Sequence, residues 1–373
     1  MPGVATGDRA LKVAFTIEQA WHRVPGGTAV AAIGSAVALL ERPDVELTGL
    51  SARHPRQPAM ALPVALELRQ MPLPRLLLYE AWHRWRKPKI DIALAGADVI
   101  HATAFPVPPR SHPLVLTIHD LAFLHEPAHF TPRGNRFFRR GLEVALREAD
   151  LVVCPSEATR DDCVAHGFDP ARLRVVHLGV DLRHASEEEV IRVRDKYGLE
   201  RPYVLWVGTI EPRKNVPALV QAFASLGRKD VDLVLVGPSG WNEDLGATLA
   251  PIAQRVRTLG SVGRKELTAL YAGATLFCFP SLLEGFGLPV LEAMSQGTAV
   301  VTSRGTSTEE LAGGAGVVVD PRDVPALAQA IERLLDDDDE RGRLASAGRE
   351  RAETFTWERT AHGLAQVYRE AAS

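Results

Sequence analysis

Two glutamates, Glu284 and Glu292, flank a glycine-containing loop in the segment SLLEGFGLPVLEAMSQG. The segment follows the apolar run TLFCFP, so we expect a buried strand, a loop and then a helix from about Pro289 to Ser295. Proline is favoured in the first turn of a helix, and glycine ends one. The free N–H groups of that turn bind anions, whereas carboxylates accept hydrogen bonds from hydroxyls. Phosphate combined with hydroxyls describes a sugar nucleotide. A helix cap with two solvated glutamates is the simpler alternative, but it leaves the intervening GFGLP unexplained.

A second loop places an arginine beside a lysine. In GTIEPRKN, Gly208 to Asn215, the residues Arg213 and Lys214 follow the apolar run YVLWVG and precede a helical pattern. An arginine offers a planar fork and a lysine a point charge, and such a pair at the carboxyl end of a strand suits a diphosphate. Two solvated surface cations are the alternative, which this position disfavours.

Short continuous apolar runs that alternate with helical patterns must position these loops. The first half of the chain contains LKVAFT, VELTGLS, DVIHAT, PLVLTIHD and DLVVCPS, and the second half contains YVLWVG, VDLVLVG, TLFCFP and TAVVTS. Continuous runs are typical of strands covered on both faces, and their alternation with helices predicts parallel sheets. We therefore predict an α/β protein with two doubly wound, Rossmann-like domains joined by a polar linker that begins at Leu182. In such sheets ligands bind beyond the carboxyl ends of the strands.

Two features of the first half fall at such strand ends. One is the pair Gly26-Gly27 before a helical pattern, and the other is His119-Asp120 at the end of PLVLTIHD. The glycines fit a ligand-binding loop or a plain turn, and His119 fits either a functional or a structural role. His101 is a weaker candidate for a functional histidine, and His125 and His129 are weaker still. No G-x-G-x-x-G fingerprint is present, which argues against a nicotinamide enzyme.

The GFGLP segment, together with EPRKN and TIHDL, resembles the signature of retaining glycosyltransferases of family 4, in their bacterial mannosyltransferase-like branch. These enzymes have the GT-B architecture, in which two Rossmann-like domains face each other across a cleft. The resemblance implies that Glu284 and His119 contact the donor sugar and that Glu292 holds the ribose hydroxyls. It also implies that the basic pair neutralises the leaving diphosphate and that the glycine pair lies against the diphosphate and the sugar. Many relatives carry an arginine where this chain has Thr209, so we assign the phosphate role to Arg213 and Lys214.

The expected site follows from these assignments and from a resemblance of LGSVGRKELTALYAGA to the loop that lines the nucleotide base. The predicted catalytic residues are His119, Arg213, Lys214 and Glu284. The predicted substrate-binding residues are Gly26, Gly27, Gly208, Thr209, Val262, Gly285, Phe286, Gly287, Leu288 and Glu292.

The resemblance also suggests how the chain divides. Residues 1–183 would form the N-terminal, acceptor-side domain, residues 184–354 the domain that binds the nucleotide sugar, and residues 355–373 a helix that returns to the N-terminal domain. The expected reaction moves a hexose, with mannose favoured, from a nucleotide diphosphate sugar to a hydroxyl of a glycan, glycolipid or small molecule. The alternatives are a nucleotide-sugar 2-epimerase of the same architecture and a non-catalytic subunit that binds a nucleotide sugar.

We expect no cofactor and no catalytic metal, because no Asp-x-Asp motif occurs in a plausible place. The favoured donor is GDP-mannose, with UDP- or dTDP-sugars as alternatives. Both carboxylates are assigned to hydroxyls, so a glycosidase-like pair flanking the bond is not expected. The acceptor proton would instead pass to the departing phosphate on the same face of the sugar.

Composition excludes several other classes of protein. The chain has 373 residues and a net charge of −3, which gives no indication of nucleic-acid binding. It has three cysteines without metal-ligand spacing, no apolar signal core and no run long enough to span a membrane, so we expect a cytoplasmic protein. Residues 69–90 are basic and aromatic, and such a helix can lie on an anionic membrane at the inner face. An ordinary surface helix that packs Trp82 or Trp85 inward is the alternative.

Overall fold

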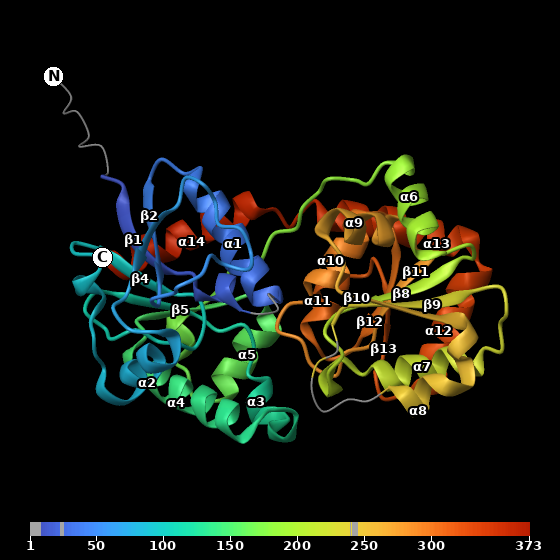
Figure 1. The fold of residues 1–373 in the computed structure, drawn as a ribbon, viewed down its shortest axis with the longest axis horizontal. Helices are drawn as coiled ribbons and strands as arrows, with labels where there is room; N and C mark the ends of the chain where they lie inside the picture. The colour runs from blue at the N-terminus through green and yellow to red at the C-terminus, as the bar shows by residue number, and fades with distance from the viewer. Residues whose placement is uncertain (1–8, 23–25, 239, 241–244) are drawn as a thin grey trace. The chain divides into compact units, whose positions relative to one another are not determined.

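The structure is a computed structural model that describes residues 9–22, 26–238, 240 and 245–373 (Figure 1). The chain divides into two units. Unit 1 consists of Met1–Gly179 together with Trp357–Ser373, and unit 2 consists of Val180–Thr356. Each unit contains a parallel sheet with helices around it, which confirms the predicted α/β class with two Rossmann-like domains.

Unit 1 is built on a seven-stranded sheet in the order β3-β2-β1-β4-β5-β6-β7, and all its strand pairs are parallel. The strands are β1 (Leu11–Thr16), β2 (Val45–Ser51), β3 (Glu67–Gln70), β4 (Val99–Ala102), β5 (Leu114–Thr117), β6 (Leu151–Cys154) and β7 (Leu173–Val175). The strand order reverses between β1 and β4, so the loops after these strands open the crevice where doubly wound sheets bind ligands.

The helices of unit 1 cover both faces of this sheet (Figure 1). They are α1 (Gly27–Leu40), α2 (Arg75–Trp85), α3 (Ala122–His125), α4 (Pro132–Glu148), α5 (Glu157–Ala165) and α14 (Trp357–Ala372). Four short 3₁₀ segments accompany them: Glu18–Trp21, Ile90–Ile92, Pro127–His129 and Pro170–Arg172. The last helix, α14, packs against α1. The contact is close, since a Cβ on Gly34 of α1 would lie 2.5 Å from the Trp357 ring.

Unit 2 is built on a six-stranded parallel sheet in the order β10-β9-β8-β11-β12-β13. The strands are β8 (Tyr203–Val207), β9 (Asp232–Val236), β10 (Val256–Gly260), β11 (Leu276–Phe279), β12 (Ala299–Ser303) and β13 (Val317–Val319). Here the reversal lies between β8 and β11. These are the two strands that precede the EPRKN and EGFGLP loops, so the sheet brings both motifs to one crevice.

The helices of unit 2 complete this layered arrangement. They are α6 (Glu187–Tyr197), α7 (Val216–Ser225), α8 (Gly246–Leu249), α9 (Arg264–Ala272), α10 (Leu288–Ser295), α11 (Ser307–Ala312), α12 (Val324–Asp336) and α13 (Asp338–Ala352), with 3₁₀ segments at Pro212–Lys214 and Ala250–Arg255. Ser186 and Glu189 form a capping box at the N-terminus of α6, the first helix of the unit. The box satisfies backbone N–H groups that would otherwise lack an intrahelical partner.

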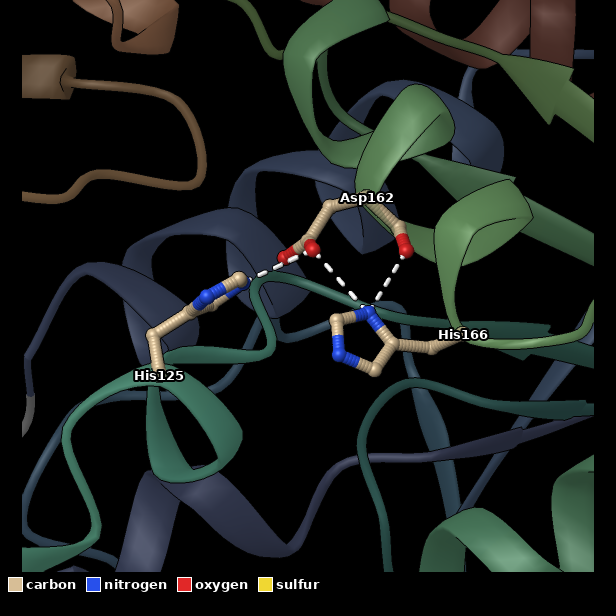
Figure 2. Close-up of side chains that lie close together, drawn as sticks. All are labelled: His125, Asp162 and His166. Carbon is tan, nitrogen blue, oxygen red and sulfur yellow. Dashed lines mark hydrogen bonds and ion pairs between the residues drawn. The ribbon is translucent and has the colours of Figure 1, made fainter.

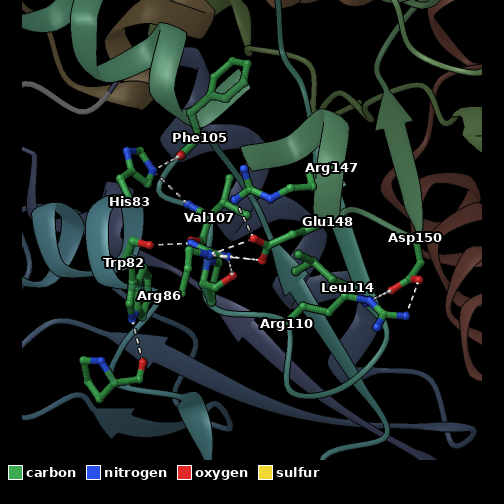
Figure 3. Close-up of polar contacts among 12 residues, drawn as sticks. Trp82, His83, Arg86, Phe105, Val107, Arg110, Leu114, Arg147, Glu148 and Asp150 are labelled. Atoms are coloured by element: carbon green, nitrogen blue, oxygen red, sulfur yellow. Dashed lines mark hydrogen bonds and ion pairs between the residues drawn. The ribbon is translucent and has the colours of Figure 1, made fainter. Parts of the chain in front are cut away.

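The basic aromatic segment 69–90 is held to unit 1 by one of its own arginines (Figure 3). The Arg86 guanidinium lies 2.6 Å from the Glu148 carboxylate and donates to the backbone carbonyls of Val107 and Pro108 at 2.9 and 2.6 Å. Trp82 is buried and donates to the Pro88 carbonyl at 3.0 Å, whereas Trp85 is 65% exposed. Trp82 is therefore the inward tryptophan, and Arg86 is a structural anchor instead of a surface charge.

Among the described residues, no helix combines the length and the apolar character that a bilayer span requires.

Candidate functional site

The centre of the site in unit 2 is an ion pair between the two motifs. Lys214 ends the 3₁₀ turn after β8, and Glu284 follows β11. The Lys214 ammonium lies 2.6 Å from Glu284 Oε1, and the two side chains are only 10% and 7% exposed. The ammonium also lies 5.0 Å from the centre of the Phe279 ring, at the end of β11. The structure thus joins two residues that the sequence placed in separate loops.

Arg213 extends this pair into a row of alternating charges. Its Nε lies 2.6 Å from Glu211 Oε1, and its Nη1 lies 3.5 Å from Glu284 Oε2. Glu211 is buried, and sequence reasoning missed it, although it precedes the basic pair in EPRKN. Two carboxylates and two cations leave the row with no net charge.

The protonation of this row follows from burial and from its neighbours. Burial opposes ionisation of Glu284, but Lys214 and Arg213 outweigh it and hold the pKa of the carboxyl below its ordinary value. Burial, with the nearby Arg213 cation, lowers the pKa of Lys214. A lysine has three N–H donors, so Lys214 keeps two for a ligand while it bonds Glu284.

The loop between Glu284 and α10 is held in place by a buried serine. The Ser307 hydroxyl, at the start of α11, lies 2.8 Å from the carbonyl oxygens of both Glu284 and Phe286. Gly287 has φ 107°, and a Cβ there would lie 2.6 Å from Thr308 Cγ2, so only glycine fits. The loop leads directly into α10, which begins at Leu288 with a proline in its first turn. Nothing in the sequence marks Ser307, because its contacts span more than twenty residues.

Glu292 lies one turn into α10, in a pocket of its own. Its Oε2 accepts a hydrogen bond from the Tyr271 hydroxyl at 3.0 Å. The pocket is also lined by Asp181, Arg264 and Gln296. Burial raises the pKa of Glu292. A carboxyl group with one bonded oxygen in a polar pocket is suited to hold a vicinal diol, which is the role that the resemblance gave it.

Gly208 and Thr209 follow β8. The backbone after the neighbouring strand β9 lies very close to Gly208. A Cβ on Gly237, which follows β9 with φ 135°, would lie 1.8 Å from the Gly208 carbonyl oxygen. The Gly208 N–H donates to Val236 at 2.9 Å. The structure therefore requires glycine at position 237, which the sequence analysis did not predict. Val262, predicted to present its backbone to the base, is half-buried after β10.

In unit 1 the structure places His119 after β5, facing another loop of the same sheet edge. Its Nε2 lies 3.0 Å from the Thr103 carbonyl, which can only accept, so Nε2 carries the proton. Burial lowers the pKa of His119, so the ring is neutral at pH 7 and Nδ1 is an acceptor. Asp120 accepts the Ala122 N–H at 3.0 Å and so orders the loop.

The weaker candidate His101 is a structural residue. It is 2% exposed, its Nδ1 lies 2.7 Å from the Tyr368 hydroxyl, and its Nε2 lies 2.8 Å from Thr117 Oγ1. Burial lowers its pKa to about 3. Both nitrogens are engaged within the protein, so the structure gives His101 a structural role and does not test the suggested functional one.

The predicted glycine pair begins α1. Gly26 is the N-cap and Gly27 the first residue, both are exposed, and no heavy atom lies within 4 Å of a Cβ built on either. Among the residues that the structure describes, nothing therefore crowds the start of this helix, which is a kind of position where anions bind.

A further polar pair lies at the same edge of the unit 1 sheet, and no motif in the sequence marks it. The buried Glu18 carboxylate accepts the Ala52 N–H at 2.8 Å and lies 2.7 Å from His54 Nε2. His54 in turn stacks on Trp21, with ring centres 4.6 Å apart. Burial raises the pKa of Glu18.

Comparison with known proteins adds family and fold. Residues 25–184 match the family model described as Glycosyltransferase Family 4, and residues 201–337 match that of Glycosyl transferases group 1. The O-antigen chain mannosyltransferase B of Escherichia coli is 36% identical over 270 residues, which are 70% of this chain and 71% of that protein. The MMP alpha-(1->4)-mannosyltransferase of Mycolicibacterium hassiacum is 37% identical over 64% of this chain, and the match spans 58% of that protein.

Among solved structures, HepE of Anabaena in complex with UDP-glucose aligns with a TM-score of 0.74 over 96% of this chain and 100% of that one. At 21% identity the likeness concerns the fold.

Proposed function

Since this chain belongs to glycosyltransferase family 4, we propose that it is a retaining hexosyltransferase that takes a nucleoside diphosphate sugar as its donor. The sugar passes to a hydroxyl of a glycan, glycolipid or small-molecule acceptor. No metal ion takes part in the chemical step. The observation that carries the proposal is the buried Lys214–Glu284 pair at the crevice between β8 and β11.

The pair suits a leaving diphosphate because it is pre-organised. Lys214 is fixed by Glu284 and by the Phe279 ring, so little reorganisation is needed when charge develops on a phosphate oxygen. The row formed with Arg213 and Glu211 has no net charge, so attraction for the anion comes from N–H dipoles. Lys214 contributes two free N–H groups, and the first turn of α10 contributes backbone N–H groups.

The sugar and the ribose are assigned to the remaining polar groups. Glu284 keeps an ionised carboxylate beside the loop and accepts hydrogen bonds from hydroxyls of the transferred sugar. Glu292, with Tyr271, holds the ribose hydroxyls. The neutral His119 accepts a hydrogen bond from a hydroxyl of the sugar at Nδ1, while its Nε2–H donates to the Thr103 carbonyl.

The chemical step breaks the bond between the anomeric carbon and the diphosphate oxygen. The acceptor oxygen attacks from the same face, and its proton passes to the departing phosphate oxygen. Retention follows from this same-face exchange. The protein supplies positioning and charge stabilisation, which can together lower the barrier substantially.

Mannose is the favoured sugar and GDP-mannose the favoured donor. The motifs TIHDL and EPRKN resemble the mannosyltransferase branch, and two relatives at 36% and 37% identity are named mannosyltransferases. HepE, which has the same fold, was solved with UDP-glucose, and this supports a uridine nucleotide as a competing donor. UDP- and dTDP-sugars are therefore the competing donors.

We also propose that α2 and the residues after it touch an anionic membrane. Leu76, Leu77 and Trp85 are 60–65% exposed, which is unusual for large apolar side chains. Three basic residues near the end of this helix are also exposed: Arg84, Lys87 and Lys89. Exposed apolar residues on a short helix, with basic residues at its end and just after it, are the features of an interfacial segment.

The test combines donor binding with turnover. Thermal unfolding is measured with GDP, UDP and dTDP and with their sugars; a ligand at a hundred times its Kd stabilises by about 2.7 kcal/mol. GDP-mannose should give the largest shift and should be consumed only when an acceptor is present, with retention shown by NMR of the product. An epimer formed from donor alone, or binding without transfer to any of a panel of acceptors, would contradict the proposal.

A further inference from the structure

A group of metal-ligating side chains lies apart from the candidate site, on the side of unit 1 formed by α3 and α5. His125 is the last residue of α3, Asp162 lies in α5, and His166 follows the last residue of α5. Figure 2 shows both imidazole rings directed at the Asp162 carboxylate. Across the parts of the chain that the structure describes, it is the one set of three such side chains close enough to share an ion.

The distances are close to those of a metal shell. Asp162 Oδ1 lies 2.8 Å from His125 Nε2 and 3.1 Å from His166 Nδ1. One ligand atom from each residue falls within 4.8 Å of the others. A tetrahedral ion with bonds of about 2.0–2.1 Å holds its ligand atoms roughly 3.3 Å apart. The two contacts of Asp162 are therefore within about half an ångström of this spacing.

The local structure prepares these groups to converge. Asp162 and His166 are four residues apart on α5, which places them on one face of the helix. The two rings are nearly perpendicular, at 88°, with centres 5.3 Å apart, so their nitrogens approach the carboxylate from different directions. The side chains are 41%, 20% and 30% exposed in chain order, so an ion can enter and water can complete its shell.

We propose that His125, Asp162 and His166 bind one divalent transition-metal ion of the Zn²⁺ type, with water as the fourth ligand. Two imidazoles and one carboxylate suit Zn²⁺, whereas Mg²⁺ and Ca²⁺ prefer oxygen ligands. On binding, the ion replaces the N–H protons that now point at the carboxylate and at the Asp162 carbonyl.

The ion would tie α3 to α5 beside the loop that carries His119. α3 begins three residues after His119, and Thr159 of α5 donates to the His119 carbonyl at 3.4 Å. Cation binding therefore stiffens this loop from outside and takes no part in bond breaking. The inference does not depend on the proposed transfer reaction.

The test is a titration of ZnCl₂ into the full chain after chelator treatment, followed by calorimetry, with CoCl₂ as a spectroscopic probe. The wild type should bind one equivalent more Zn²⁺ than the His125→Gln/His166→Gln variant, and Zn²⁺ should raise its Tm. Co²⁺ should give visible bands of four-coordinate intensity that this variant lacks. MgCl₂ should produce neither effect.

His112→Gln is the matched control, because His112 forms a similar 2.8 Å contact with Asp91 but has no second imidazole. It should bind metal as the wild type does. His125→Gln alone, at a largely exposed position, serves if the double variant does not fold. Equal stoichiometry and equal Co²⁺ spectra in wild type and the His125 variants would overturn the proposal.

Discussion

The ammonium of Lys214 and the carboxylate of Glu284 lie 2.6 Å apart, in loops that follow adjacent parallel strands. The contact is therefore a property of the sheet order, since β8 and β11 are neighbours although seventy residues separate the two side chains. The same two residues should therefore contribute both to the stability of unit 2 and to the reaction proposed for it.

Breaking this pair should destabilise the protein more than removing it. Lys214→Met leaves a buried carboxylate without its main partner, and such losses cost about 3–5 kcal/mol. The double variant Lys214→Met/Glu284→Gln carries neither charge, so most of the lost stability should return. Thermal unfolding of the single and double variants measures this difference. Additive losses in the double variant would show that the two groups do not interact.

Transfer should depend on Lys214 regardless of stability. Glu284→Gln is the reference, because Glu284 is itself assigned to the sugar. The double variant differs from it only in lacking the ammonium that faces the leaving phosphate, so its turnover should be lower again by roughly ten- to a thousandfold. Kinetics with saturating donor measure this. Chelator should leave transfer by the His125→Gln/His166→Gln variant unchanged, because no metal takes part in the chemical step and this variant lacks the ion proposed near His119; a loss restored by a divalent ion would contradict that statement.

The alkaline decline of activity should occur at a lower pH than the titration of an ordinary lysine. Burial and Arg213 lower the pKa of Lys214, so the ammonium loses its proton, and transfer falls, as pH rises through a value below about 10.4. Lys214→Arg stays charged throughout this range, so its kcat/KM should lack the alkaline limb. NMR titration of the lysine ε-carbons gives a direct second reading. An unshifted limb in the arginine variant would assign the titration to another group.

Ser307 should act as a positioning residue for the loop. Ser307→Ala removes the buried hydroxyl that donates to the carbonyls of Glu284 and Phe286, which should cost about 1–3 kcal/mol. The donor KM should rise, because the loop that faces the sugar loosens. Ser225→Ala is the matched control, since its hydroxyl bonds only Ala222 within α7. Equal effects of the two variants on KM would argue against the positioning role.

Binding to anionic vesicles should depend on three basic residues, of which Arg84 lies in α2 and Lys87 and Lys89 follow it. Each such residue near a membrane surface contributes about 1 kcal/mol, so replacing Arg84, Lys87 and Lys89 by glutamine should lower partitioning roughly a hundredfold. Flotation with phosphatidylglycerol vesicles measures this. Arg86 must be kept, because it anchors the segment to Glu148.

The control for the membrane prediction removes the same number of charges elsewhere. Lys229, Arg322 and Arg343 are exposed in unit 2, and their glutamine variant should float as the wild type does. Absence of wild-type binding, or an equal loss in both triple variants, would remove the membrane proposal.

The sequence predicted those parts of the fold that depend on local pattern. Apolar runs located the buried strands such as β1, β8 and β11, and the proline in GFGLP located α10, which begins at Leu288. The short edge strand β3, with the sequence ELRQ, escaped because it is mostly exposed and has no apolar run. The division at Gly179 and Thr356 rests on long-range packing, for which the sequence holds only indirect signals.

The parts of the site that escaped prediction depend on partners far along the chain. His101 has the residue type and strand-end position of a functional histidine, yet it bonds Tyr368, 267 residues later. Arg86 lies in a basic helix but is fixed by Glu148, sixty-two residues away. Such assignments need the topology, because residue type and spacing are the same for a buried partner and for a ligand.

The placement of α14 determines the order in which the two units can be completed. Unit 2 is one continuous stretch of chain, whereas unit 1 needs Trp357–Ser373, which is synthesised after unit 2. On the ribosome, unit 2 can close while the face of unit 1 that receives Tyr368 and Leu364 is still bare. A nascent chain stalled before Trp357 would therefore expose apolar surface in its first-made half, which is the surface that chaperones engage during synthesis.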